Sequence, residues 1–424
     1  MKLNKYYIYL SYLNLFLGFI NAFLQPFVFN KFFEASSFSF LLILYGISVY
    51  MSFFDGGISK PLYVLIREKY VKFQPHNKII KEIISFYLVV LIIVSIVFSF
   101  IVFLLNSSYG LIFDNSLLLL FSLFISINVI ITSFKDILWA IDKYEFFEKI
   151  EIIRRVINLG SALLIFIDKT LYTSFIFQLS ITGLLLLYII YVINDNKFYK
   201  LSIFKINLNQ TYIFLKKHFS DGKYYLGFTL NEKLIYNSGF LILVFFLQPV
   251  EIVIYGLFIR VFNGVSSFSK IINNFYVHDI TKKFIGNEVE NTKLLIRNNI
   301  FLSLAMTILL FICFLIADKY LFVYWVDKQY SFGNLTIISL LIWLFSNSIQ
   351  HIAGTVLVSI GGAFKKLFNI SLVIVINMLI FSLLILLIFN DLEKYLFINS
   401  IIYFFGTIFY LLTLFKVLNE RIKS

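Results

Sequence analysis

Charged residues, histidines and cysteines are all scarce in this sequence, and each shortage excludes a class of protein. Charged residues make up only 14% of the 424 residues, whereas a soluble domain usually has about 25%. Cys313 is the single cysteine, so the chain has neither an internal disulfide nor a cysteine-based metal centre. The four histidines lack the spacing of metal ligands. We therefore expect no metal and no cofactor.

Long polar segments are also missing. The gaps between apolar segments are too short to hold a soluble domain. No Gly-x-x-x-x-Gly-Lys-Ser/Thr loop is present, which argues against a P-loop ATP site. Lys2 and Lys5 precede the first apolar segment, but no small-residue cleavage pattern follows it. We expect this segment to be a retained span rather than a signal peptide.

What the sequence has in abundance is long apolar segments. Hydrophobic residues make up 60% of the chain, and a membrane span needs roughly 20 of them in succession. The fifth segment is short, so it either begins earlier or lies tilted. Twelve spans are predicted at residues 8–29, 38–58, 83–105, 116–138, 152–168, 171–193, 224–247, 252–274, 298–317, 335–358, 367–389 and 396–415.

The positive charges alternate along these spans. Of the 36 Lys and Arg residues, 28 lie at the two termini or in every second gap, and only five lie in the other gaps. Lys and Arg accumulate on the cytoplasmic side of a bilayer. The pattern predicts a multi-pass membrane protein with both termini in the cytoplasm. We attribute the net charge of +13 to this topology and to anionic lipid headgroups, not to nucleic acid.

The chain divides into two halves. We predict a six-helix bundle over residues 1–194, a cytoplasmic linker with an amphipathic segment over 195–223, and a second six-helix bundle over 224–424. Tyr45-Gly46 and Tyr255-Gly256 are offset by about half the chain, as expected for parallel repeats. The predicted fold class is therefore an all-α membrane protein with about twelve transmembrane helices in two bundles.

Charged residues inside the spans are the candidates for function, because burying a charge in lipid is costly. Arg260 lies near the middle of the eighth span. It is either a fixed cation for a phosphate, which its planar guanidinium suits, or a structural partner of Glu232 or Asp55. Asp55 closes the second span. It marks either a helix end or a functional carboxylate.

Glu232 and Lys233 are neighbours in the seventh span. Side chains of adjacent helical residues point about 100° apart, so the two do not face each other. Lys233 either contacts a substrate or snorkels to the inner surface, and Glu232 is a candidate for binding a coupling proton or cation. Most neutral polar residues in the spans are expected to bond across helices: Asn14, Asn21, Asn128, Gln178, Asn237, Asn263 and Asn377.

Three stretches of the sequence carry recognisable motifs: the second-span end FFDGGISKPLYVLIRE, the hairpin LILVFFLQPVEIVIYGLFIRVF, and the late pattern YLFVYWVDKQY followed by LVSIGGAFKKLFNISLVIVINMLI. Together they resemble motifs of polysaccharide flippases in the multidrug/oligosaccharidyl-lipid/polysaccharide (MOP) superfamily. Two positions depart from the resemblance: Gly56 replaces an apolar residue, and Asp327 stands where glycine is common.

This resemblance implies an O-antigen flippase with a fold of the MATE/MOP type. Such a protein moves undecaprenyl-pyrophosphate-linked oligosaccharide across the bacterial inner membrane by alternating access, driven by a proton or sodium gradient. Its partners would be this substrate, membrane lipids and other polysaccharide-assembly proteins. Arg260 matches a cavity arginine of the family. The implied site residues are Arg260, Lys233, Lys60 and Lys270 for the substrate, and Glu232 and Asp55 for the coupling ion.

Three other interpretations compete with this one, and the simplest of them, a purely structural membrane protein, would not need Arg260 inside a span. A multidrug extruder of the same superfamily exports cations and would favour acidic residues in its cavity, whereas this chain has more intramembrane Lys and Arg. A membrane polymerase would carry a large outer loop with catalytic Arg and His, but the largest predicted outer gap, 318–334, contains no histidine. The sequence therefore favours an anionic, lipid-linked substrate and a transporter that is not an enzyme.

Overall fold

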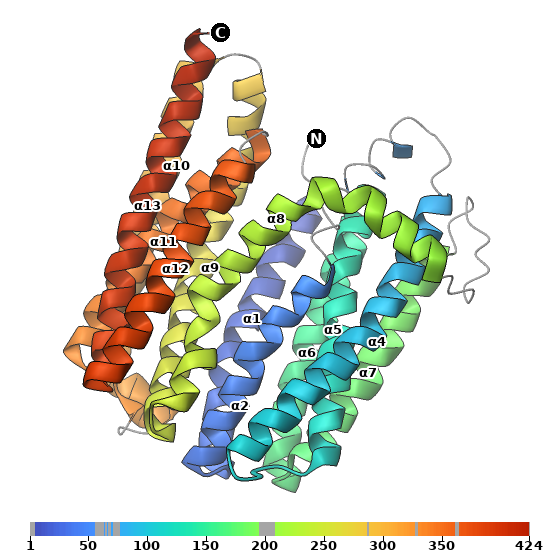
Figure 1. Cartoon of the computed structure of the whole chain (residues 1–424), viewed down its shortest axis with the longest axis vertical. Coiled ribbons are helices and arrows are strands. Elements are labelled where there is room, and N and C mark those ends of the chain that lie inside the picture. Colours follow the sequence, from blue (N-terminus) through green and yellow to red (C-terminus); the bar gives the residue numbers. More distant parts are fainter. Residues whose placement is uncertain are drawn as a thin grey trace. The chain divides into compact units, whose positions relative to one another are not determined.

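A computed structural model gives the structure of the chain (Figure 1). It describes residues 5–55, 63, 66, 69–70, 77–194, 208–285, 288–326, 330–360 and 364–423. Regular structure in these residues is entirely helical. This follows from the composition, because a backbone in lipid must satisfy its hydrogen bonds internally and a helix does so within one segment.

The chain separates into two compact units, Met1–Leu226 and Gly227–Ser424. In the N-terminal unit α1 packs against α6, α5 packs against α4 and α7, and α6 also packs against α7. The helices of this unit are α1 (Lys5–Phe32), α2 (Ala35–Ser48), α4 (Asn77–Ser108), α5 (Asn115–Ala140), α6 (Tyr144–Asp168) and α7 (Leu171–Asn194), with the 3-10 helix η1 (Val49–Asp55).

In the C-terminal unit, α9 packs against α10 and α11, and α13 packs against α11 and α12. Helix α8 begins before the boundary between the units and ends within this one. The elements are α8 (Leu208–Ile242), the 3-10 helix η2 (Leu243–Phe245), α9 (Pro249–Ile285), α10 (Val289–Trp325), α11 (Asn334–Ile360), α12 (Phe364–Phe389) and α13 (Leu392–Lys423).

The predicted spans correspond to the helices one for one in the described part of the chain. Nine of these helices are long and apolar enough to cross a membrane, and Ala35–Met51 is a shorter apolar helix. The fold is therefore that of a multi-pass, all-helical membrane protein, as predicted. The fifth span does begin earlier than residue 152, because α6 starts at Tyr144.

Two boundaries differ from the prediction. The α-helix of the second span ends at Ser48, and the chain continues to Asp55 as a 3-10 helix, a tighter form that is frequent at helix ends. The amphipathic segment expected in the linker is the first part of α8, so from Leu208 onward it forms one helix with the seventh span. The rest of the linker, 195–207, lies outside the described residues.

Candidate functional site

A first polar cluster joins α1 to α6 in the N-terminal unit. Asn14, Gly18 and Asn21 recur at helical spacing on one face of α1. Nδ2 of Asn14 donates to Oε2 of Glu148 at 3.0 Å, and Nε of Arg155 donates to Oδ1 of Asn14 at 3.5 Å. The Arg155 guanidinium lies over Gly18, where an added Cβ would be 3.4 Å from Nε. Asn14 of α1 thus bonds to both a carboxylate and a guanidinium of α6 and ties the two helices together.

The same cluster extends to α5 through Arg154. Nε and Nη2 of Arg154 donate to Oδ1 of Asn128 at 3.0 and 2.7 Å, and Nη1 pairs with Glu151 one turn earlier. Each charged residue of this cluster makes at least one hydrogen bond. Buried polar groups that are satisfied in this way fix helices relative to one another. We therefore assign the N-terminal cluster a structural role.

The neutral polar residues behave in two ways. Four of the seven bond to another helix, as predicted: Asn14, Asn21, Asn128 and Gln178. Asn237 and Asn377 instead donate to carbonyls of their own helices, at 3.3 and 2.8 Å. A carboxamide can donate to a carbonyl of its own helix or to a group on another helix. The sequence pattern does not distinguish these two cases.

A second polar cluster lies in the C-terminal unit. Its first part consists of four aromatic residues and one asparagine, which we term the tyrosine layer. The hydroxyl of Tyr236 donates to Oδ1 of Asn347 at 2.8 Å and lies 2.5 Å from the hydroxyl of Tyr403. The Tyr236 ring stacks on Phe262, and Trp343 meets Phe262 edge-on. These five residues come from α8, α9, α11 and α13, so the layer ties four helices together.

A charged layer lies next to the tyrosine layer, on the side that the charge pattern predicts to be cytoplasmic. Glu232 precedes Tyr236 by one turn on α8, and His351 follows Asn347 by one turn on α11. On α9, Lys270 follows Phe262 of the tyrosine layer by eight residues, or about two turns. The ammonium group of Lys270 acts electrostatically on both Glu232 and His351. Three helices thus bring an acid, a base and an imidazole close together.

These three groups do not bind one another directly. No hydrogen bond, and no ion pair within 4.0 Å, joins Glu232, Lys270 and His351 in the described part of the chain. All three are partly exposed, whereas Asn347 and Tyr403 in the tyrosine layer are buried. Nδ2 of Asn347 has no hydrogen-bond partner among the described residues. The charged layer therefore leaves its charges accessible to a ligand and has a hydrogen-bonded wall behind it.

The structure brings some of the predicted site residues together and separates others. Glu232 lies within electrostatic reach of both Lys233 and Lys270. Arg260, which is partly exposed, precedes Lys270 by ten residues on α9, or about 15 Å along the helix axis at 1.5 Å per residue. Arg260 therefore belongs to a different level of the C-terminal unit.

Two predicted site residues cannot be placed in the same way. Asp55 is the last residue of η1, and its side chain, like all of Lys60, lies outside the described part of the structure. The sequence prediction for both stays a prediction.

Sequence reasoning missed several residues of both clusters. None of Glu148, Arg154 and Arg155 was predicted as a site residue, and the two arginines were counted among the cytoplasmic charges. All three lie in α6 and bond to α1 or α5. The helical spacing of Trp343, Asn347 and His351 was a usable signal for the second cluster, since polar groups at this spacing share a face of an otherwise apolar span.

The chemistry open to the second cluster is binding and proton or ion exchange. No group of three or more His, Cys, Asp or Glu residues that could hold a metal ion occurs in the residues described here. Lys270 offers a positive charge to an anion, and Glu232 offers a carboxylate to a cation or proton.

Comparison with solved structures identifies the fold. The chain is similar to a multidrug resistance MATE family transporter of the MOP superfamily in an inward-facing conformation, with a TM-score of 0.67, 12% identity, and 96% of each chain covered. It is also similar to the lipid II flippase MurJ in an inward closed conformation, with a TM-score of 0.63, 14% identity, and coverage of 97% of this chain and 87% of MurJ.

A third similar structure is the MATE transporter VcmN of Vibrio cholerae, with a TM-score of 0.55, 12% identity, and coverage of 98% of this chain and 97% of VcmN. No protein-family profile matches the sequence, and no curated protein is similar to it. At these identities the likeness concerns the fold. This chain has the fold shared by MATE transporters and a lipid flippase of the MOP superfamily.

Proposed function

We propose that this chain is a flippase for an anionic, lipid-linked oligosaccharide, of the kind carried on undecaprenyl pyrophosphate as an O-antigen repeat unit. The observation that carries the proposal is the excess of cations inside the spans of the C-terminal unit. Three cations, Lys233, Arg260 and Lys270, lie in the spans of α8 and α9, and Glu232 is the one carboxylate that the structure describes well inside these two spans, since Glu251 lies in the first turn of α9. A cavity built for cationic drugs would have the opposite balance.

The proposal explains why the charges are retained despite their cost. A lysine or arginine at the centre of a span costs about 2.5–3.5 kcal/mol on insertion scales, and such residues mark the pathways of charged substrates. A pyrophosphate head crosses lipid slowly by itself, whereas its polyprenyl tail can stay in the bilayer. Fixed cations along the protein would lower the barrier for the head alone.

The proposed roles follow from the positions of the residues. Lys270 and Lys233 are the proposed contacts for the pyrophosphate near the predicted cytoplasmic side, and Arg260 is a later contact about 15 Å from Lys270 along the axis of α9. Lys60 is a further candidate on the strength of the sequence alone. Glu232 couples the cycle to a proton or sodium gradient, with Asp55 as the other candidate. The protein would work by alternating access in the bacterial inner membrane, alongside other polysaccharide-assembly proteins.

Complementation tests the proposal directly. The chain is expressed, with the sugar cluster of its own gene neighbourhood, in a Gram-negative strain that lacks its O-unit flippase, and membrane insertion is confirmed by immunoblotting. We expect a restored lipopolysaccharide ladder. A chain that is inserted normally but gives no ladder with its own sugar cluster contradicts the proposal.

Arg260 provides the residue-level version of this test. Arg260→Ala should abolish the ladder without reducing membrane insertion, because the pyrophosphate loses a cation along its path. Arg260→Lys should restore it only in part, since a point charge lacks the two-pronged geometry of guanidinium. Normal display by Arg260→Ala would remove this residue from the mechanism.

A multidrug antiporter of the MATE type is the second candidate. It is favoured by Glu232, a partly exposed carboxylate within the membrane, and by the MATE structures that share the fold. The two candidates differ in how they respond to Glu232→Gln. A flippase should keep some flipping but lose its dependence on the imposed ion gradient, whereas an antiporter should also lose binding of a cationic dye measured by fluorescence polarisation.

A further inference from the structure

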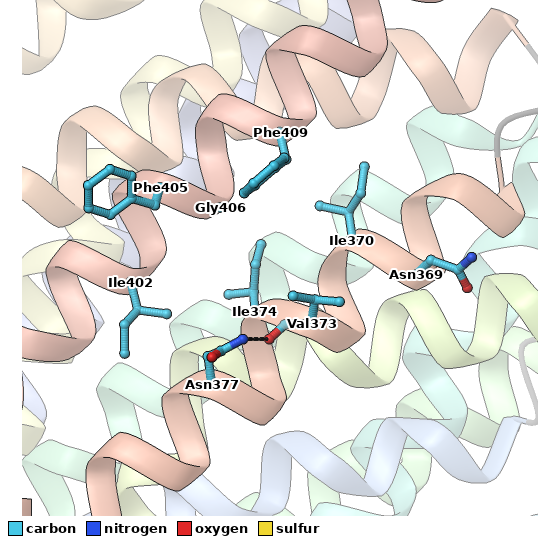
Figure 2. Close-up of a pocket in the computed structure, with 9 residues that line it drawn as sticks. All are labelled: Asn369, Ile370, Val373, Ile374, Asn377, Ile402, Phe405, Gly406 and Phe409. Atoms are coloured by element: carbon cyan, nitrogen blue, oxygen red, sulfur yellow. Dashed lines mark hydrogen bonds between the residues drawn. The ribbon is translucent and has the colours of Figure 1, made fainter.

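An apolar groove runs between α12 and α13 of the C-terminal unit, away from the charged layer (Figure 2). Its volume is about 410 Å³, within the roughly 300–1,000 Å³ range of ligand pockets. Nine residues line it: Asn369, Ile370, Val373, Ile374, Asn377, Ile402, Phe405, Gly406 and Phe409. Only two of them are polar, so the groove suits a hydrocarbon.

The close approach of the two helices forms the floor of the groove. A Cβ on Gly406 would lie 2.4 Å from Cδ1 of Ile374, so any larger residue at this position would force the Ile374 side chain to shift. Phe405 and Phe409 form one rim and are more than half exposed, and Val373 forms the other. The amide of Asn377 donates to the carbonyl of Val373 at 2.8 Å (Figure 2), so its donor is already satisfied at the groove wall.

Basic residues follow at one end of the groove. Lys365 and Lys366 precede Asn369 by one turn on α12, and both are exposed. Lys416 follows Phe409 by seven residues on α13, on the same helical face, and is also exposed. Lys366 lies 3.9 Å from Glu420, which brings these two helix ends together. The charge pattern predicts this end to be cytoplasmic.

The length of the groove points to one lipid chain. From Asn369 to Asn377 the groove follows nine residues of α12, and the eight steps between them rise about 12 Å along the axis. Half of the ~30 Å hydrocarbon core is about 15 Å. The groove therefore begins near a basic membrane surface and spans roughly one leaflet. A polyprenyl chain is much longer than one leaflet and would extend beyond it.

We propose that this groove is a binding site for an anionic phospholipid of the cytoplasmic leaflet. One acyl chain lies between α12 and α13 over Gly406, and the phosphate of the headgroup is held by Lys365, Lys366 and Lys416. Anionic lipids are attracted to basic residues at the cytoplasmic surface, and the apolar groove adds selectivity for a chain that reaches the bilayer midplane. This site is separate from the charged layer and does not depend on the proposed flippase activity.

Native mass spectrometry of the full chain in detergent tests the proposal. Phosphatidylglycerol and phosphatidylcholine with identical acyl chains are added separately, and each is also added together with undecaprenyl phosphate. We expect phosphatidylglycerol to bind at least tenfold more tightly than phosphatidylcholine. Equal binding of the two lipids, or displacement of phosphatidylglycerol by an equal concentration of undecaprenyl phosphate, overturns the proposal.

Variants locate the site. Val373→Trp fills the groove and should reduce phosphatidylglycerol binding about tenfold. Ile376→Trp, on the same helix and similarly exposed but outside the groove, should not. Lys365→Gln with Lys366→Gln should remove most of the preference for phosphatidylglycerol, roughly a tenfold loss, while Lys293→Gln at another helix should leave it intact. If Val373→Trp does not fold, the lysine variants decide, and an unchanged preference in them contradicts the site.

Discussion

The two polar clusters use similar residue types in different ways. In the N-terminal unit each charged residue is held by a hydrogen bond, such as that of Arg155 to Asn14 or of Arg154 to Asn128. In the C-terminal unit Glu232, Lys270 and His351 lie close together but do not bond to one another. Charges that are fully paired fix a structure, and charges that are near each other but unpaired remain able to bind something else.

This comparison has an energetic basis. Removing one partner from a satisfied buried network leaves the other partner with an unmade bond, so such networks are costly to disturb. A layer of partly exposed charges that do not bond to one another loses little stability when one charge is removed. Stability measurements and transport measurements should therefore separate the two clusters.

The largest effect on stability is expected for Arg155→Ala. The change removes the bond to Asn14 and the packing over Gly18, and leaves a cavity between α1 and α6. We expect a loss of about 3 kcal/mol, measured by chemical denaturation in mixed micelles. Lys149→Ala removes an exposed charge from the same helix and its contact with the Tyr6 ring; it is the control and should cost no more than about 1 kcal/mol. Equal effects of the two variants would contradict a structural role for the cluster.

The sequence predicted the helices well because a membrane span leaves two strong signals. Apolar length located the twelve α-helices that the structure describes, and α6 (Tyr144–Asp168) begins earlier than the apolar core of the fifth span. The prediction was less accurate where charged residues lie within a helix. Arg154 and Arg155 look like loop residues in a count of charges, yet they lie within α6, because Asn14, Asn128 and Glu151 supply partners that hydropathy does not register.

The candidate site was only partly predictable for a related reason. Glu232 stood out as a charge within an apolar segment, and Lys270 entered through the family resemblance. The structure places the two near each other. His351 and Asn347 come from a helix more than 70 residues further along the chain, so their approach to Glu232 is a property of packing. No local pattern encodes that contact, whereas the helical spacing within α11 does mark its polar face.

Lys270→Ala should separate function from stability. Because Lys270 makes no ion pair within 4.0 Å with Glu232, we expect its loss to change the free energy of unfolding little. Transport in the complementation assay should fall about tenfold, since the charge is removed from the accessible layer. Lys270→Arg should retain part of the activity, and Lys293→Ala, an exposed charge on α10, should retain all of it. Full activity in Lys270→Ala would place the charged layer with the structural cluster.

The smallest effect is expected for Tyr236→Phe, which tests whether the tyrosine layer resembles the N-terminal cluster. The change removes the hydroxyl that bonds to Asn347 and Tyr403 but keeps the ring on Phe262. A single buried hydrogen bond contributes about 1 kcal/mol, so the loss of stability should be near this value, while transport stays within about twofold. Tyr9→Phe, at an exposed position of α1, should change neither. If Tyr236→Phe instead abolishes transport at unchanged stability, the hydroxyl belongs with the charged layer, because only a group that meets the moving substrate or ion would affect the rate without affecting the fold.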